Sequence, residues 1–178
     1  MEPGEAFMMR LHWIGALLMI VACGGIGFGI AMYDKKEYSC LRQLQNATEF
    51  MLCELNCRLT PLPGLLRKTA AQCGGDLRTF FCILVEELES QVAPDVSCCV
   101  TIALDRCSNL PGKVRIVLQQ TGHTMGQFDL EGQIKGLESA GQTCERYCKE
   151  MEVNRPQRLR SYPTLGLCIG AVLAILFM

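Results

Sequence analysis

Two uncharged, strongly apolar stretches border the chain and dominate its hydrophobic pattern. The first, residues 11–32, contains no aspartate, glutamate, lysine or arginine. At about 1.5 Å per helical residue it can cross a hydrocarbon core of about 30 Å. The second, residues 163–178, is shorter, but local bilayer thinning and an interfacial tyrosine at 162 can accommodate it. We predict a transmembrane helix at each stretch, preceded by an N-terminal tail over residues 1–10.

Between these stretches, apolar side chains recur every three or four residues, which is the period of an amphipathic helix. A first helix is predicted over 38–59, continuing from the first apolar stretch. Its apolar stripe consists of Leu41, Leu44, Thr48, Met51, Leu55 and Leu59. The one β-like run, 114–118, is short. We therefore expect residues 33–161 to form an all-α bundle of about six helices.

Proline and glycine set the predicted ends of the shorter helices, because proline suits a first helical turn and glycine suits a helix end. The predicted ranges are 61–73, a third helix capped by Asp76, a fourth over 95–108 and a fifth over 113–122. The third helix directs Leu77, Phe80, Phe81, Leu84, Val85 and Leu88 inward.

A non-helical segment is predicted between Gly122 and Gly126. The long sixth helix is predicted to follow it, with Asp129 as its N-terminal cap. Its apolar stripe consists of Ile134, Leu137, Gly141, Cys144, Cys148 and Met151. Pro156 and Pro163 should interrupt the join to the second apolar stretch, because each removes a backbone donor and crowds the preceding turn.

The number and position of charged residues bear on nucleic-acid binding and on the orientation of the chain in a membrane. With a net charge of −1 and no basic stripe, the chain is not expected to bind nucleic acid. Positive residues flank both apolar stretches on the side of the bundle: Lys35, Lys36, Arg42, Arg155, Arg158 and Arg160. The positive-inside rule therefore predicts that the bundle lies in the cytoplasm and that both termini lie outside.

An acidic cluster stands out within the bundle, at Glu86, Glu87 and Glu89. Two interpretations remain open, a solvated helix face and a patch that docks a partner.

The chain has 12 cysteines, which a cytoplasmic location would keep reduced. Two pairs, Cys53 with Cys57 and Cys144 with Cys148, are spaced so that each shares one helix face. If their helices touched, the four thiolates could bind zinc. The alternative is that the cysteines serve as small core residues, with no metal or other cofactor bound.

Both apolar stretches contain glycines four residues apart, at Gly25 with Gly29 and at Gly166 with Gly170. This spacing lets helix backbones approach closely in lipid. The spans are therefore expected to pack on one another or on other membrane proteins, unless the glycines reflect only the ordinary composition of membrane helices.

No pattern of residues points to catalysis or to a small-molecule substrate. There is no phosphate-binding loop motif, and His123 lacks the neighbours of a catalytic triad. The sequence is not expected to be an enzyme. Residues 20–23, IVAC, are similar to a bacterial lipobox, so a membrane-anchored lipoprotein is an alternative, as is a cysteine-rich zinc or redox membrane protein. The apolar run continues beyond Cys23, however, where lipoproteins turn polar.

Four ordered motifs resemble the stage III sporulation protein AB family of endospore-forming bacteria, over about residues 9–178. They are WIGALL at 13–18, LRQLQ at 41–45 leading to TPLP at 60–63, GHTMGQFDLEGQ at 122–133, and LGLCIG at 165–170. The resemblance leaves Met1, Met8 or Met9 as the start residue. The departures from the family pattern are the many cysteines and the prolines at 156 and 163.

The resemblance implies a sporulation role that the residues alone do not supply. Such proteins belong to a channel complex in the mother-cell membrane around the forespore. Their helical domain is similar to half of the platform protein of type II secretion machines. It would dock a secretion-type ATPase, stage III sporulation protein AA, beside other channel components. Gly122, Gly126, Asp129 and Gln133 match the family's loop and are candidate partner-binding or structural residues.

Overall fold

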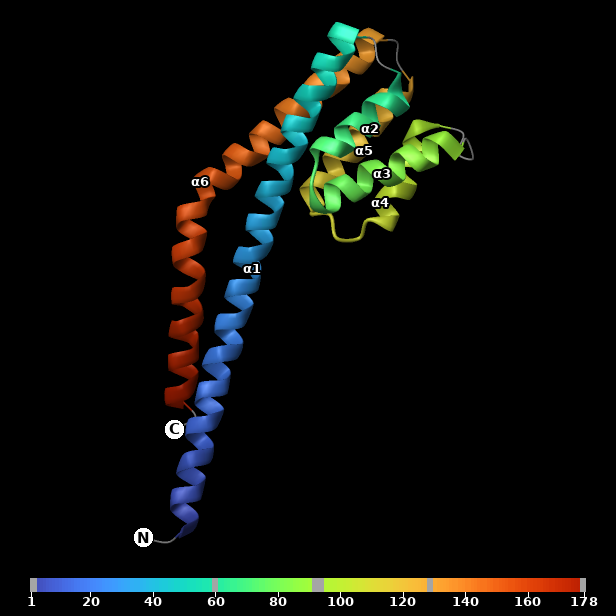
Figure 1. The fold of residues 1–178 in the computed structure, drawn as a ribbon. Helices are drawn as coiled ribbons and strands as arrows, with labels where there is room; N and C mark the ends of the chain where they lie inside the picture. The colour runs from blue at the N-terminus through green and yellow to red at the C-terminus, as the bar shows by residue number, and fades with distance from the viewer. Residues whose placement is uncertain (1–2, 59–60, 91–94, 128–129, 177–178) are drawn as a thin grey trace. The chain divides into compact units, whose positions relative to one another are not determined.

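The computed structural model describes the backbone at residues 3–58, 61–90, 95–127 and 130–176, and side chains at residues 25, 29–58, 61–90, 95–125 and 130–153. Over these ranges the protein is all-α, with six helices (Figure 1). They are α1 (Pro3–Arg58), α2 (Leu62–Gln72), α3 (Gly75–Ser90), α4 (Val96–Arg106), α5 (Gly112–Gln127) and α6 (Leu130–Leu176). The predicted fold class of the bundle is confirmed.

The chain divides into two compact units. Unit 1 combines residues 1–35 with 152–178, and unit 2 consists of residues 36–151. Judged over the residues whose side chains are described, no helix is long and apolar enough to cross a membrane. The predicted spans at 11–32 and 163–178 fall almost wholly outside those residues, so they stay predictions.

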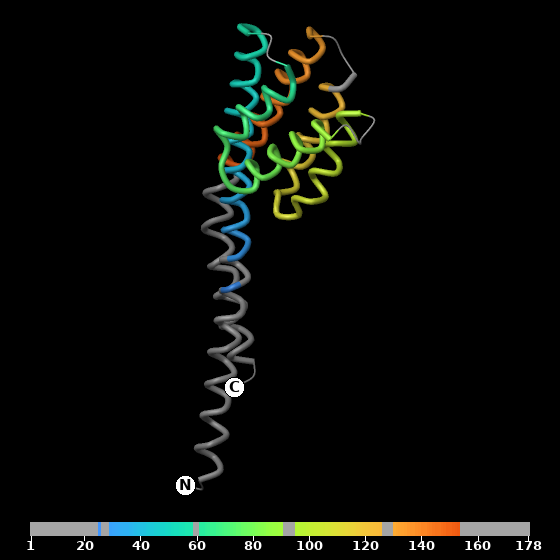
Figure 2. Tube along the Cα trace, turned by 45° about the vertical axis from the view of Figure 1, so that its right-hand side comes forward, coloured from blue at the N-terminus to red at the C-terminus, as the bar shows by residue number. Residues whose placement is uncertain are grey.

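Unit 2 is built on the antiparallel segments of α1 and α6, which run side by side in both views (Figures 1 and 2). A Cβ atom added to Gly141 of α6 would lie 3.3 Å from the Thr48 Oγ1 atom of α1, so the two backbones approach closely. The other four helices pack in chain order, α2 on α3, α3 on α4 and α4 on α5. One hydrophobic core connects all six helices.

The predicted apolar stripes form this core. On α1, Leu41, Leu44, Thr48, Met51 and Leu55 are buried. On α3, Leu77, Phe80, Phe81, Leu84 and Val85 are buried, and Leu88 packs against the core. The rings of Phe80 and Phe81 meet edge to face at 5.4 Å, a favoured aromatic geometry. Burial of these apolar side chains, rather than helix propensity, supplies most of the stabilisation.

The predicted break between Gly122 and Gly126 is wrong, because α5 continues to Gln127. Glycine in a helix interior costs up to about 1 kcal/mol relative to alanine. Packing offsets that cost here. A Cβ atom at Gly122 would lie 2.8–3.0 Å from three side-chain atoms of Val100, so the missing side chain lets α5 approach α4. Thr121 and Met125 are buried on the same stretch of helix.

The predicted interruption of the sixth helix is also wrong, because α6 extends from Leu130 to Leu176 through Pro156 and Pro163. A proline removes one intrahelical hydrogen bond, but the flanking residues keep theirs, so a helix can continue past it. Helices α2 and α4 start and end within two residues of their predicted limits.

Candidate functional site

The start of α1 in unit 2 bears a group of polar side chains that reach the turns between the other helices. Lys36 Nζ lies 2.7 Å from Asp76 Oδ2, in the first turn of α3. The same ammonium group donates a hydrogen bond of 3.0 Å to the backbone oxygen of Asn109, in the turn between α4 and α5. One lysine of α1 therefore contacts two turns that are far apart in the sequence.

Glu37, the next residue, is 7% exposed and accepts a 3.2 Å hydrogen bond from the backbone N–H of Lys113. That N–H belongs to the first turn of α5, where backbone donors lack intrahelical partners. The residue before α5 is Pro111, whose side chain has no acceptor to offer. Glu37 thus caps α5 from another helix, and its charge is favourably placed at a helix N-terminus.

Gln43, about two turns further along α1, accepts a 3.2 Å hydrogen bond from the backbone N–H of Gly74 at the start of α3. We call Lys36, Glu37 and Gln43 the polar clamp. It joins α1 to the N-terminal ends of α3 and α5 through an ion pair and through hydrogen bonds between side chains and backbone groups.

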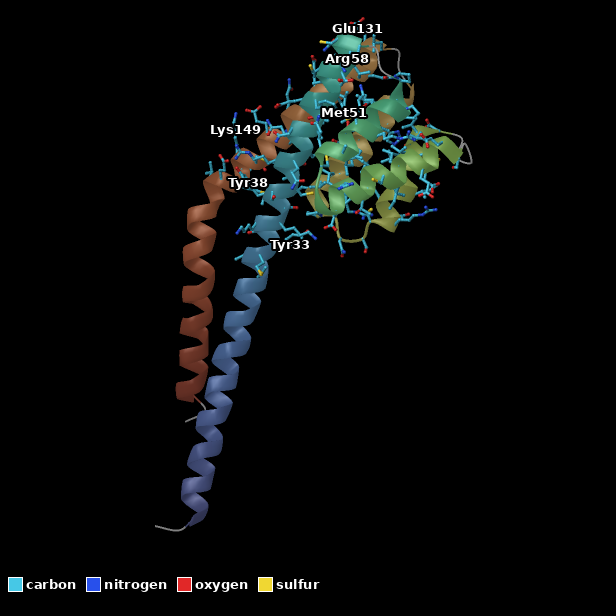
Figure 3. The ribbon with its side chains drawn as sticks, viewed as in Figure 1. Tyr33, Tyr38, Met51, Arg58, Glu131 and Lys149 are labelled. Atoms are coloured by element: carbon cyan, nitrogen blue, oxygen red, sulfur yellow. The ribbon has the colours of Figure 1, made fainter. Side chains whose placement is uncertain are left out.

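The opposite end of unit 2, which we call the distal end, consists of residues 53–58, 61–62 and 130–135. Figure 3 shows Arg58 and Glu131 together at this end, and Tyr38 and Lys149 toward the other end of the α1 and α6 pair. Glu54 connects the distal end of α1 to α2, with Oε2 2.6 Å from Lys68 Nζ and Oε1 3.4 Å from Arg58 Nη1.

Two glutamates of the acidic cluster at the end of α3 form ion pairs with different neighbouring helices. Glu87 Oε1 lies 2.8 Å from Arg106 Nη1 of α4, and Glu89 pairs with Arg67 of α2. Glu86 is exposed. Two of the three carboxylates therefore pair α3 with its neighbours within the chain, while Glu86 and Glu89 are both exposed.

The candidate residues near the start of α6 are only partly brought together. Gly122 is buried against α4, and Gly126 belongs to α5. Gln133 is half-buried on the first turns of α6. Asp129, the predicted cap, lies outside the described residues.

The four cysteines proposed as a zinc site do not meet. Cys53 and Cys57 are exposed near the end of α1, whereas Cys144 and Cys148 are buried on α6. Cys144 lies near Cys40 of α1, and Cys40 precedes Cys53 by more than three helical turns, about 20 Å. Within the described ranges, no group of three metal-ligating side chains gathers. The antiparallel register of α1 and α6 separates the two cysteine pairs along the helices.

The buried cysteines have the properties of core residues. Burial is the main cause that raises the pKa of Cys144 to about 12, and the pKa values of Cys40 and Cys73 to about 11. Thiols with such pKa values stay protonated near neutral pH, so they are poor nucleophiles and poor metal ligands.

The glycine pairs of the two apolar stretches are described only in part. Gly25 and Gly29 are exposed, and a Cβ atom at either would meet nothing within 4 Å. The side-chain surroundings of Gly166 and Gly170 lie outside the described residues. Close packing of the glycine pairs stays a prediction.

Sequence reasoning did not identify the polar clamp. Lys36 attracted attention only as a positive residue beside an apolar stretch, and Glu37 and Gln43 carry no local signal. Their partners lie between 31 and 76 residues away along the chain.

Comparison with known proteins finds a matching family and a similar solved structure. The sequence model of the family named stage III sporulation protein AB matches residues 12–178. A solved structure entitled "Stage III sporulation protein AB (SpoIIIAB)" is similar with a TM-score of 0.61 and 22% sequence identity, over 68% of this chain and 98% of that chain. At that identity the structural likeness shows the fold alone. No curated protein matches the sequence. Because the family match covers nearly the whole chain, the protein belongs to the stage III sporulation protein AB family.

Proposed function

We propose that the protein is a non-enzymatic membrane component of a channel complex between mother cell and forespore. In this proposal unit 2 lies in the cytoplasm of the mother cell and docks a secretion-type ATPase of the stage III sporulation protein AA kind. The observation that carries the proposal is the family match over residues 12–178. The all-α bundle with the predicted spans at its two ends supports it.

The chain direction favours the distal end as the docking surface. Unit 2 begins at residue 36 and ends at residue 151, and both residues continue into the segments that carry the predicted spans. The segment of α1 from 36 to 58 extends about 33 Å at about 1.5 Å per residue. Within unit 2, the distal end is the end of α1 farthest along the helix from residue 36, and we propose the docking surface there.

The distal end offers both charged and apolar contact groups. Side chains of Arg58, Glu131 and Lys135 are 67–74% exposed, and Leu130 is 41% exposed. Exposed charges of both signs can set the orientation of a partner and its rate of association. This surface includes Gln133, one of the residues that match the family's loop.

The polar clamp supports a coupling role for α1. Motion of a docked ATPase would act on the distal end, and within unit 2 α1 runs from that end to the polar clamp. Because Lys36, Glu37 and Gln43 hold the starts of α3 and α5 to α1, the bundle would move with α1 rather than slide along it.

Binding to the ATPase tests this proposal. The full chain in detergent micelles should bind the purified ATPase, and the double variant Arg58→Glu with Glu131→Lys should bind it at least about tenfold more weakly, equal to about 1.4 kcal/mol. The matched control is Arg78→Glu with Glu150→Lys, which makes the same exchanges at exposed positions away from the distal end.

Each outcome has a defined meaning. Equal loss in both double variants would place the contact elsewhere or show a general charge effect, and would overturn the distal-end assignment. Failure of the wild-type chain to bind the ATPase at all would overturn the platform proposal. ATP hydrolysis by the purified chain alone would contradict its non-enzymatic character.

A further inference from the structure

Two thiols near the end of α1 differ from the buried cysteines of the core. Cys53 and Cys57 are both exposed and lie one helical turn apart. Their side chains are hydrogen-bonded to each other. Sulfur atoms within hydrogen-bond reach on one helix face can be bridged by a single ligand with small changes of side-chain torsion.

The surroundings limit what such a ligand can be. The carboxylate between them in sequence, Glu54, is already bound to Lys68 and Arg58. In the part of the chain that the structure describes, no third ligating side chain gathers beside the pair. Two exposed thiols suit a soft ion of low coordination number, whereas zinc commonly takes four ligands and hard cations prefer oxygen.

We propose that Cys53 and Cys57 form a two-thiolate site for a soft monovalent metal ion, with Cu(I) as the ion whose chemistry fits best. Thiolate sulfur selects Cu(I) over harder cations, and Cu(I) accepts two ligands in a linear arrangement. Binding forms two Cu–S bonds and releases two thiol protons, and no atom changes its oxidation state. The site is independent of the platform proposal.

The chemical contrast with the other cysteines supports this assignment. Burial raises the pKa of Cys40, Cys73 and Cys144 to about 11 or 12, so those thiols resist deprotonation by a metal. Hydrogen bonding with Cys57 is the main cause that raises the pKa of Cys53. A bound cation reverses that effect, because it stabilises both thiolates and replaces the shared proton.

A bound ion would also have a structural consequence. Cys57 is one residue from the end of α1, where helix ends ordinarily fray. A metal bridge from Cys57 back to Cys53 would tie the last turn to the preceding one. It would thereby fix the position from which Glu54 and Arg58 contact α2.

The test is a Cu(I) titration of the full, reduced chain in detergent under anaerobic conditions, in competition with a chromogenic Cu(I) chelator. The wild-type chain should hold one Cu(I) more tightly than any further ions. Cys53→Ser and Cys57→Ser should each weaken that site by at least about 100-fold. The double variant Cys82→Ser with Cys98→Ser, which removes exposed thiols from α3 and α4, should leave it unchanged.

X-ray absorption of the copper complex measures the number and arrangement of sulfur atoms around the ion. A purely structural role of the two cysteines would not produce such a coordination. Two sulfur neighbours in a linear arrangement are expected. Unchanged affinity in Cys53→Ser, equal loss in the control variant, or three or more sulfur neighbours would each overturn the proposal. Circular dichroism should show equal helix content in all variants, because each substituted side chain is exposed. Loss of helix in Cys53→Ser alone would assign the pair a structural role and also overturn the proposal.

Discussion

Replacing Gly136 by alanine tests how closely α5 and α6 pack. A Cβ atom at this position would lie 2.6 Å from Thr124 Cβ and 3.3 Å from Thr124 Cγ2. Thr124 Cβ is bonded directly to the backbone, so a change of rotamer cannot move it away. Either the two helices separate or their register shifts.

The expected cost follows from two opposing effects. Overpacking of this kind costs about 1–3 kcal/mol. Alanine is better than glycine in a helix interior by about 1 kcal/mol, which offsets part of that cost. The matched control is Gly112→Ala on α5, where a Cβ atom meets nothing within 4 Å. The control should be neutral or stabilising by up to about 1 kcal/mol.

Alkylation of Cys144 provides the assay, because this thiol is 0% exposed and reacts only when α6 opens. The full chain in detergent is treated with a maleimide, and the labelled peptide is quantified by mass spectrometry over time. A difference of about 1–3 kcal/mol between the two variants corresponds to about 5- to 150-fold faster labelling in Gly136→Ala.

A compensating substitution makes the reasoning falsifiable. Thr124→Gly removes every side-chain atom that the new methyl group would meet. Added to Gly136→Ala, it should slow the labelling of Cys144, whereas in the wild-type chain it should speed it. Labelling no faster in Gly136→Ala than in Gly112→Ala would refute the close approach of α5 and α6.

Three further predictions follow from the same structure. Glu37→Ala removes the acceptor that caps α5, at a cost of about 1 kcal/mol, and should speed the alkylation of buried Cys107 in the turn before α5 about fivefold. The control Glu49→Ala, at an exposed position, should not. Gly75→Ala should lower the free energy of unfolding by about 1–2 kcal/mol in denaturant titration, because Gly75 has a φ of +57°. Burial raises the pKa of Cys144 from 9.0 to about 12, so the unfolded chain loses this proton first and stability should fall between pH 9 and 12. A flat stability profile over that pH range would contradict the burial of this thiol.

Periodic positions made much of the bundle predictable from sequence. The stripe from Leu41 to Leu55 and the stripe from Leu77 to Val85 repeat with the helical period, and both are buried as that period requires. Such patterns are local, because the period fixes which side chains share a face before any partner is known. Helix type and core-facing residues followed from them.

Glycine and proline were less informative because each has more than one structural use. From the sequence, Gly122 predicts a break in the helix, but in the structure it gives Val100 the space to approach α5. Pro156 and Pro163 predict interruptions of the sixth helix, but α6 continues through both. The deciding contact for Gly122 comes from another helix, and no local pattern contains that information.

The sequence does not predict the polar clamp or the ion pairs of the acidic cluster, because the partner residues lie on other helices. Glu37 is separated from Lys113 by 76 residues, and its capping role exists only after α1 and α5 have packed. The sequence leaves Glu87 and Glu89 as part of either a solvated face or a docking patch, but each pairs with a basic residue on a different neighbouring helix. Charge in a sequence predicts exposure more readily than it predicts pairing.

The location of unit 2 in the cytoplasm is the central claim, and thiol labelling tests it most directly. The chain is expressed in growing cells, where it would lie in the plasma membrane, and intact cells are treated with a membrane-impermeant maleimide. The exposed thiols of Cys53 and Cys57 should remain unlabelled until the cells are permeabilised. A cysteine placed in the N-terminal tail by Glu5→Cys should be labelled in intact cells, as the positive control. Labelling of Cys53 and Cys57 in intact cells would contradict the platform account and favour the lipoprotein alternative.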